Sequence, residues 1–242
     1  MKHPPQVVLF DLGNTLLYDD PDAWPEVYRR AEQALWNALH EAGVRTSPDA
    51  LYAKSGSLLK YYYGLRQSDL QEPGMAPTLE ALLRRQGIHI SHESLQAALS
   101  SMYTVTQSNW HSEEDAVPTL AALRDRGIPL GALSNGADDR NARQLLEKAG
   151  LTPFFDLVLS SAAFGWRKPH EGIFRAALAR FESPAERVVM VGDSYEADIL
   201  GAHRAGLATI WITRRIRHVP AIMPVKPDFT VHTLSEIPAL IA

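Results

Sequence analysis

The stretch that most constrains this fold is an apolar run, residues 7–10, that ends abruptly at Asp11 and is followed by Gly13-Asn14-Thr15. A short, partly β-branched apolar run bounded by a turn signal predicts a buried parallel strand. In open α/β sheets ligands bind at the carboxyl ends of the strands, so this strand would deliver Asp11 to the chemically useful edge. A turn residue or a helix cap is the alternative interpretation of a single aspartate in this position.

Two kinds of periodicity divide the rest of the chain. Residues 18–112 have apolar positions at helical spacing and no convincing strand, which predicts helices that begin near residues 20, 47, 78 and 91, the second of them continuing to residue 63. From residue 113 on, strand and helix alternate. Strands are expected at 128–133, 157–159, 188–191, 208–212 and 229–231, and helices at 118–126, 139–149, 171–181, 196–205 and 235–241.

Repeated units of this length imply right-handed crossovers and a doubly wound parallel sheet. The sequence therefore predicts an α/β, Rossmann-like core made of residues 1–17 and 113–242, with an inserted all-helical domain at residues 18–112.

Composition excludes several classes of function. Hydrophobic residues make up 45% and charged residues 21% of the chain, as in an ordinary globular protein, and the net charge is -4. A net negative charge does not favour binding to nucleic acid or to an anionic membrane. The one dense basic run is expected to be a solvated loop and consists of Arg214, Arg215, Arg217 and His218. The absence of cysteine excludes disulfides, thiolate metal sites and cysteine nucleophiles. The sequence contains no signal peptide or membrane-spanning run, so a cytoplasmic location is expected.

Three other segments of the predicted core carry polar side chains that could lie near Asp11. Ser134-Asn135-Gly136 ends one strand, Lys168-Pro169 precedes a helix, and Gly192-Asp193 follows another strand with Asp198 in the next helix. Parallel strands would bring all of these segments to one edge of the sheet. Each also has a plainer interpretation: Ser134 as a helix N-cap, Lys168 as a solvated side chain, Asp193 as a turn residue and Asp198 as a charge favoured by the helix dipole.

The residue types fit phosphoryl transfer. Asp11 and Asp193 offer the hard oxygen ligands that Mg²⁺ takes, and without a cation two carboxylates would repel each other and a phosphate dianion. Phosphoryl transfer requires positioning and charge neutralisation, which Mg²⁺, the Lys168 ammonium and the Ser134 hydroxyl can supply. Asp11 can then act as an in-line nucleophile that forms an aspartyl-phosphate, which water later cleaves.

These segments, in this order, resemble the four motifs of the haloacid dehalogenase (HAD) superfamily: Asp11-Leu12-Gly13-Asn14-Thr15, Ser134-Asn135-Gly136, Lys168-Pro169 and Gly192 to Asp198. The likeness covers the whole α/β core. The helical insert resembles the cap of the subfamily that includes phosphoglycolate phosphatase, pyrimidine 5′-nucleotidase and acylneuraminate phosphatase.

The resemblance implies roles for the metal ligands. Asp11 would be both the nucleophile and a Mg²⁺ ligand, the Gly13 backbone carbonyl a second ligand and Asp193 a third.

It also implies roles for the remaining motif residues. Ser134 and Lys168 would hold the transferring phosphoryl group, and Asp198 would orient Lys168 or a metal-bound water. Asn135 and Thr15 are expected to contribute to substrate binding.

Gly13 is a departure from the resemblance, because phosphatases of this family usually carry a second aspartate at that position. That aspartate protonates the leaving alkoxide and later activates water, a contribution typically worth about 10²–10⁴-fold. Tyr18, Asp19 or Asp20 is a possible substitute, and His111 is a further candidate whose alternative interpretation is a surface histidine.

Three functions compete at this stage. The leading prediction is a Mg²⁺-dependent phosphomonoester hydrolase that acts on a small soluble phosphorylated metabolite. A metal-free 2-haloacid dehalogenase also uses an aspartate nucleophile without the second aspartate, but such enzymes lack the metal carboxylate that Asp193 would supply. The third is a metabolite-binding or regulatory protein of low activity, which Gly13 suggests. The sequence indicates neither the substrate nor an oligomeric state. The aromatic residues of the insert are expected to form its hydrophobic core, and lining a pocket is their alternative role.

Overall fold

The computed structural model describes residues 4–52, 55–66, 69–216 and 219–241. Two compact units are present: a core unit of Met1–Asp19 and His111–Ala242, and a helical unit of Asp20–Trp110. No helix within the described ranges combines the length and the hydropathy that a bilayer-spanning segment needs.

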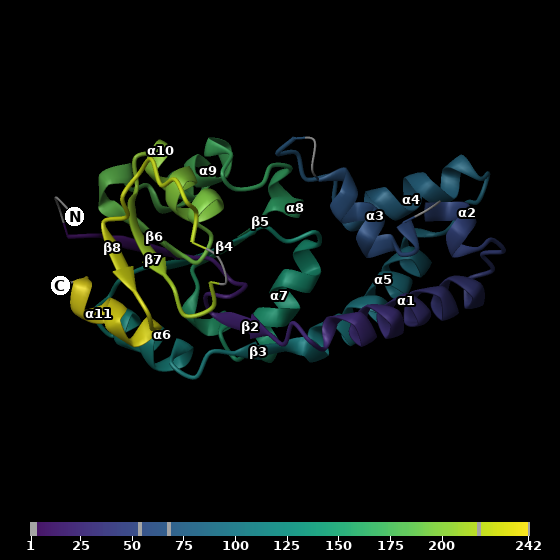
Figure 1. Ribbon diagram of the computed structural model, residues 1–242, viewed down its shortest axis with the longest axis horizontal. Helices are drawn as coiled ribbons and strands as arrows, with labels where there is room; N and C mark the ends of the chain where they lie inside the picture. Colours follow the sequence, from purple (N-terminus) through teal and green to yellow (C-terminus); the bar gives the residue numbers. More distant parts are fainter. Residues whose placement is uncertain (1–3, 53–54, 67–68, 217–218, 242) are drawn as a thin grey trace. The chain divides into compact units, whose positions relative to one another are not determined.

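The core unit is built on a parallel sheet in the strand order β5-β4-β1-β6-β7-β8 (Figure 1). The strands are β1 (Val7–Phe10), β4 (Leu130–Ser134), β5 (Leu157–Ser160), β6 (Val188–Gly192), β7 (Ala208–Ile212) and β8 (Phe229–Val231). In the central register, Phe10 pairs with Ala132 on one side and with Val191 on the other. The strands β1, β4 and β6 therefore end side by side, and the α/β doubly wound fold predicted from the sequence is confirmed.

Helices cover both faces of this sheet. The helices α9 and α10 lie on one face, and α6 and α11 lie on the other (Figure 1). The helices are α6 (Ala116–Arg124), α7 (Asp139–Lys148), α8 (Ser161–Phe164), α9 (Glu171–Phe181), α10 (Gly201–Arg204) and α11 (Ile237–Leu240). The β1 side chains Val7 and Leu9 pack with Ile173 and Phe174 of α9. This apolar packing holds the strand that carries Asp11 at its carboxyl end.

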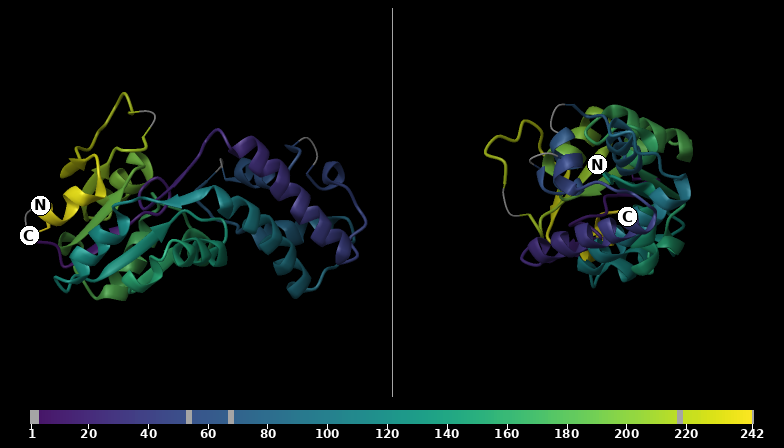
Figure 2. Two further views of the ribbon diagram at one scale, coloured as in Figure 1. Left: turned by 90° about the horizontal axis from the view of Figure 1, so that it is seen from below. Right: turned by 90° about the vertical axis from the view of Figure 1, so that its right-hand side faces the viewer.

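The helical unit contains α1 (Trp24–Glu41), α2 (Pro48–Tyr52), α3 (Leu58–Leu65), α4 (Met75–Arg85) and α5 (His92–Thr106). Its two longest helices, α1 and α5, pack against each other along their length (Figure 2). Each buries one apolar stripe, with Leu35 and Leu39 on α1 and Leu99 and Met102 on α5.

Two local expectations are wrong, and a third is confirmed with a change of helix type. The single helix expected over 47–63 is split into α2 and α3, because Gly56 takes a left-handed conformation (φ 72°) and the Ser57 hydroxyl caps a new helix start. Residues 18–112 are not free of strands, since β2 (Leu17–Asp19) and β3 (Trp110–Ser112) form a two-stranded sheet at the two crossings between the units. The helix expected over 196–205 is confirmed, but its first part, η5 (Tyr195–Leu200), is π-helical and leads into the α-helix α10.

Candidate active site

The parallel sheet brings three polar strand ends together. Asp11 follows β1 directly, Ser134 is the last residue of β4, and Asp193 follows β6. Because β1 lies between β4 and β6, all three side chains stand at the carboxyl edge of adjacent strands. The backbone N–H of Asp11 also donates to the Val191 carbonyl (2.9 Å), which extends the pairing of β1 with β6 to this residue.

Lys168 is buried among acceptors at this edge. Its Nζ lies 2.6 Å from Asp11 Oδ1, 2.6 Å from the Leu133 carbonyl oxygen and 2.7 Å from Asp198 Oδ1. Burial by itself would lower the pKa of Lys168, but the charges of Asp11 and Asp198 and the hydrogen bonds to them outweigh it and raise the pKa. Lys168 is therefore a fixed cation that holds the Asp11 carboxylate in place, and it is not the solvated lysine of the alternative interpretation.

A clamp from the neighbouring strand holds the Lys168 backbone. The Asn135 side chain accepts from the Lys168 N–H (2.8 Å) and donates to the Lys168 carbonyl (2.9 Å). Both atoms of one amide thus fix the chain on either side of the lysine Cα. The Asn135 side chain is used to position Lys168, and binding of a substrate by Asn135 stays a prediction.

The carboxylates of Asp11, Asp193 and Asp198 form a cluster in which one oxygen of each lies within 4.8 Å of the others. Burial and then the negative charge of Asp11 raise the pKa of Asp193 to about 8. Burial likewise raises the pKa of Asp198 to about 6, although the nearby Lys168 opposes that shift. One lysine does not neutralise three acids, so the cluster lacks positive charge and its donor set fits a divalent cation.

The turn after β6 fixes Asp198 beside this cluster. The Ser194 N–H donates to Asp198 Oδ2 (3.0 Å), and a Cβ placed on Gly192 would lie 2.3 Å from that same oxygen. Only glycine therefore allows the strand end to approach the carboxylate this closely. The π-helical turn that carries Asp198 is a conformation often found at functional sites.

The remaining predicted residues occupy different environments. Ser134 is half-buried, and its hydroxyl has no hydrogen-bonding partner among the described residues. Thr15 is fully buried, and its hydroxyl lies 3.5 Å from Asp11 Oδ2. Gly13 is half-buried and forms a bridge with Leu17. Metal binding by the Gly13 carbonyl and substrate binding by Ser134 and Thr15 stay predictions.

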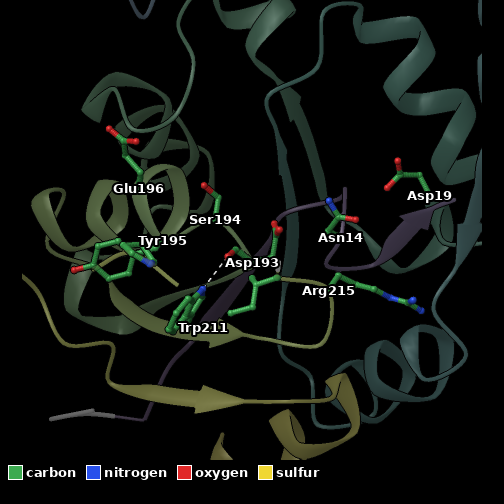
Figure 3. Close-up of a pocket in the computed structure, with 10 residues that line it drawn as sticks. Asn14, Asp19, Asp193, Ser194, Tyr195, Glu196, Trp211 and Arg215 are labelled. Atoms are coloured by element: carbon green, nitrogen blue, oxygen red, sulfur yellow. Dashed lines mark hydrogen bonds between the residues drawn. The ribbon is translucent and has the colours of Figure 1, made fainter. Parts of the chain in front are cut away.

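A pocket of about 500 Å³ opens beside Asp193 in the core unit (Figure 3). Its wall comes from the loop after β1, the end of β2, the turn after β6 with the start of η5, and the end of β7 with the segment that follows it. The lining residues are Asn14, Asp19, Asp193, Ser194, Tyr195, Glu196, Trp211, Arg215, Ile216 and Pro220. Space for a ligand is thus available next to the carboxylate cluster.

A family model described as haloacid dehalogenase-like hydrolase matches residues 5–206. The chain belongs to this family. The resemblance inferred from the four motifs is confirmed, and the protein is a HAD-like hydrolase.

Among the relatives of this HAD-like hydrolase are two named phosphatases. It is 39% identical to a phosphoserine phosphatase of Thermus thermophilus over 96% of this chain and 97% of that protein. It is 42% identical to a ribulose-1,5-bisphosphate 5-phosphatase of Halopiger xanaduensis over 84% of this chain and 82% of that protein. A 2-haloacid dehalogenase of Pseudomonas syringae pv. Tomato DC3000 has a similar structure, with a TM-score of 0.68, 25% identity and 98% coverage of both chains.

Sequence reasoning missed one support of the site, Trp211 on β7. Its indole N–H donates to the Asp193 carbonyl (2.8 Å), and its ring packs edge-on against Tyr195. The Tyr195 hydroxyl in turn donates to the Val225 carbonyl and accepts from the Val225 N–H. An apolar strand residue gives no signal of such a bond in the sequence.

A second support corrects the expectation of a solvated basic loop. Glu113, 4% exposed, accepts from both Arg214 (2.8 Å) and Arg215 (2.6 Å), and Arg214 also contacts Asp115. The Arg215 guanidinium also lies 4.0 Å from the centre of the Tyr18 ring. The expectation is therefore wrong for these two arginines, and the rest of the basic run, residues 217–218, lies outside the described residues.

Proposed function

We propose that this HAD-like hydrolase is a Mg²⁺-dependent phosphatase that hydrolyses a small phosphorylated metabolite through an aspartyl-phosphate on Asp11. The observation that carries the proposal is the Asp11 carboxylate, held by a buried lysine within 4.8 Å of two further carboxylates. Relatives named as phosphatases, aligned over most of the chain, support the same reaction class.

The chain's own residues suit each part of this reaction. Asp11 attacks phosphorus, the ester oxygen departs as an alcohol, and water then attacks the phosphorus of the aspartyl-phosphate to release inorganic phosphate and restore the carboxylate. Lys168 fixes Asp11 and adds positive charge beside the phosphoryl oxygens, and the Ser134 hydroxyl offers a hydrogen bond to one of them. Mg²⁺, held by Asp11, Asp193 and the Gly13 carbonyl, would neutralise the charge that collects on the phosphoryl group.

The test is release of phosphate from p-nitrophenyl phosphate and from a panel of sugar phosphates, nucleotides and 2-phosphoglycolate. Activity is expected to require Mg²⁺, to stop on chelation and to be lost in Asp11→Asn. Phosphate release that survives Asp11→Asn, or that needs no metal, would contradict the proposal.

A dehalogenase is the second candidate, favoured by Gly13 and by the structural similarity to a 2-haloacid dehalogenase. The carboxylate cluster argues against it, because displacement of halide from carbon involves no phosphate dianion that a cation must neutralise. Release of chloride from 2-chloropropionate without Mg²⁺, with no release of phosphate from any ester, would favour the dehalogenase instead.

A further inference from the structure

A phosphatase with this site needs a proton donor that the carboxylate cluster does not supply. An alkoxide leaves poorly from phosphorus unless its oxygen is protonated, and such assistance typically contributes about 10²–10⁴-fold to the rate. Gly13 carries no side chain for the purpose. Lys168 directs its ammonium group at three protein oxygens, and Asp198 is 1% exposed and paired with that lysine.

The pocket beside Asp193 narrows the choice of donor. Besides Asp193, the lining residues that the structure describes include four side chains with acidic or basic groups: Asp19, Tyr195, Glu196 and Arg215. The Tyr195 hydroxyl is occupied by both backbone groups of one residue in the segment after β7. Arg215 binds the Glu113 carboxylate through Nε and Nη2, and a guanidinium does not give up its proton in a protein. Two carboxyl groups remain.

Orientation separates these two carboxyl groups. In Figure 3 the Asp19 carboxyl points toward the side of the pocket where Asn14 and Asp193 lie, whereas the Glu196 carboxyl points away from Asp193. Asp19 is also half-buried, whereas Glu196 is exposed. The bridge between Gly13 and Leu17 brings the chain back beside the nucleophile loop just before Asp19, at the end of β2.

The structure argues against the other candidates for the proton donor, Tyr18, Asp20 and His111. The Tyr18 ring lies under the Arg215 guanidinium and 5.3 Å from the ring of the exposed His111, and neither Tyr18 nor His111 lines the pocket. The Asp20 carboxylate accepts from the Asp22 N–H (2.9 Å) as part of an exposed turn. Asp19 is thus the member of this group that shares a pocket wall with the carboxylate cluster.

We infer that Asp19 is the general acid and base of the hydrolysis, an inference that rests on the proposed phosphatase function. The protonated Asp19 carboxyl gives its proton to the ester oxygen as the bond from phosphorus to that oxygen breaks. The resulting carboxylate then takes a proton from the water that attacks the aspartyl-phosphate. One phosphomonoester and one water become one alcohol and one inorganic phosphate, and Asp19 ends as it began.

The test compares Asp19→Asn on two esters that differ in their need for an acid. p-Nitrophenolate leaves without a proton, so the variant should release one equivalent of it in a rapid burst and then turn over slowly, because the base of the second step is missing. Phenyl phosphate needs the acid, so the burst of phenol should be lost and its first turnover slowed by about 10²-fold or more. Asp20→Asn is the matched control and should keep the wild-type kinetics on both esters.

A rescue experiment separates proton transfer from a structural role. The rescue variant is Gly13→Asp in the Asp19→Asn background, which offers a carboxyl at the nucleophile loop. It should restore at least about a tenth of the wild-type rate on phenyl phosphate, given the size of acid–base contributions. Equal losses on both esters without a burst, or wild-type rates in Asp19→Asn, would overturn the assignment. An inactive wild-type protein, or an active Asp11→Asn, would instead mean that the proposed function itself is wrong.

Discussion

Removal of one charge from the carboxylate cluster should stabilise the metal-free protein. Asp193→Asn replaces an acid whose pKa is raised to about 8, by burial first and by the charge of Asp11 next, with a neutral side chain of similar shape. The native protein holds that proton more tightly than the unfolded chain, whose aspartates titrate near about 4. The free energy of unfolding of the metal-free wild type should therefore fall as pH rises from about 4 to about 8, and the variant should escape this loss.

The cluster geometry sets the magnitude. Two unit charges 4.8 Å apart repel each other by about 3.5 kcal/mol at an effective dielectric constant of about 20. Lys168 offsets part of this, which leaves an expected gain of about 1–3 kcal/mol for Asp193→Asn at about pH 9. In a chain of this size the gain corresponds to a rise in melting temperature of roughly 2–10 °C. At about pH 4, where Asp193 is protonated in the folded protein and largely protonated in the unfolded chain, the two proteins should melt within about 2 °C of each other.

Thermal denaturation with and without millimolar Mg²⁺ at both pH values is the assay. A cation at about 100 times its dissociation constant stabilises the folded protein by about 2.7 kcal/mol, so Mg²⁺ should raise the melting temperature of the wild type and scarcely that of the variant. Asp125→Asn removes an exposed acid outside the cluster and should respond to Mg²⁺ as the wild type does. If Asp193→Asn destabilises the metal-free protein equally at both pH values, or if Mg²⁺ shifts both proteins alike, the electrostatic reasoning fails.

Three further predictions concern the supports of the site. Lys168→Met leaves two buried carboxylates without their cation, so the free energy of unfolding measured in denaturant titrations should fall by about 3–5 kcal/mol. A fall below about 1 kcal/mol would mean that the ion pairs of Lys168 contribute little to stability. Gly192→Ala should displace Asp198 and lower both the melting temperature and the rate of phosphate release, and unchanged kinetics would contradict the expected clash between the added Cβ and the Asp198 carboxylate. Trp211→Phe removes the hydrogen bond to the Asp193 carbonyl, worth about 1 kcal/mol, so the Mg²⁺ concentration for half-maximal thermal stabilisation should rise about 5-fold.

Local sequence was enough to predict the sheet because each core strand is an apolar run with a turn after it. The same pattern predicted which residues would stand at its edge, since Asp11, Ser134 and Asp193 each come where such a run ends. Parallel pairing then brings these residues together, because it places the carboxyl ends of the strands at one edge of the sheet whatever the length of the chain between them. Convergence at one edge thus follows from strand patterns alone.

The supports of the site were not predictable in this way, because they depend on contacts between distant segments. Glu113 pairs with Arg214 and Arg215, which lie about a hundred residues further along the chain. In the sequence Trp211 is an ordinary apolar strand residue, and only the structure shows the hydrogen bond from its indole N–H to the Asp193 carbonyl. The split between α2 and α3 is different, since Gly56-Ser57 is a recognisable stop and start that a longer apolar periodicity obscured.

The central position of β1 has a consequence for biosynthesis. This strand is synthesised before the other strands of the sheet, yet its two neighbours, β4 and β6, begin only at Leu130 and Val188. The helices between them can fold while β1 still has no partner along either side, since local contacts form before distant ones. A nascent chain stopped short of β6 would carry a bare, wholly apolar strand edge, the kind of surface that recruits chaperones or aggregates.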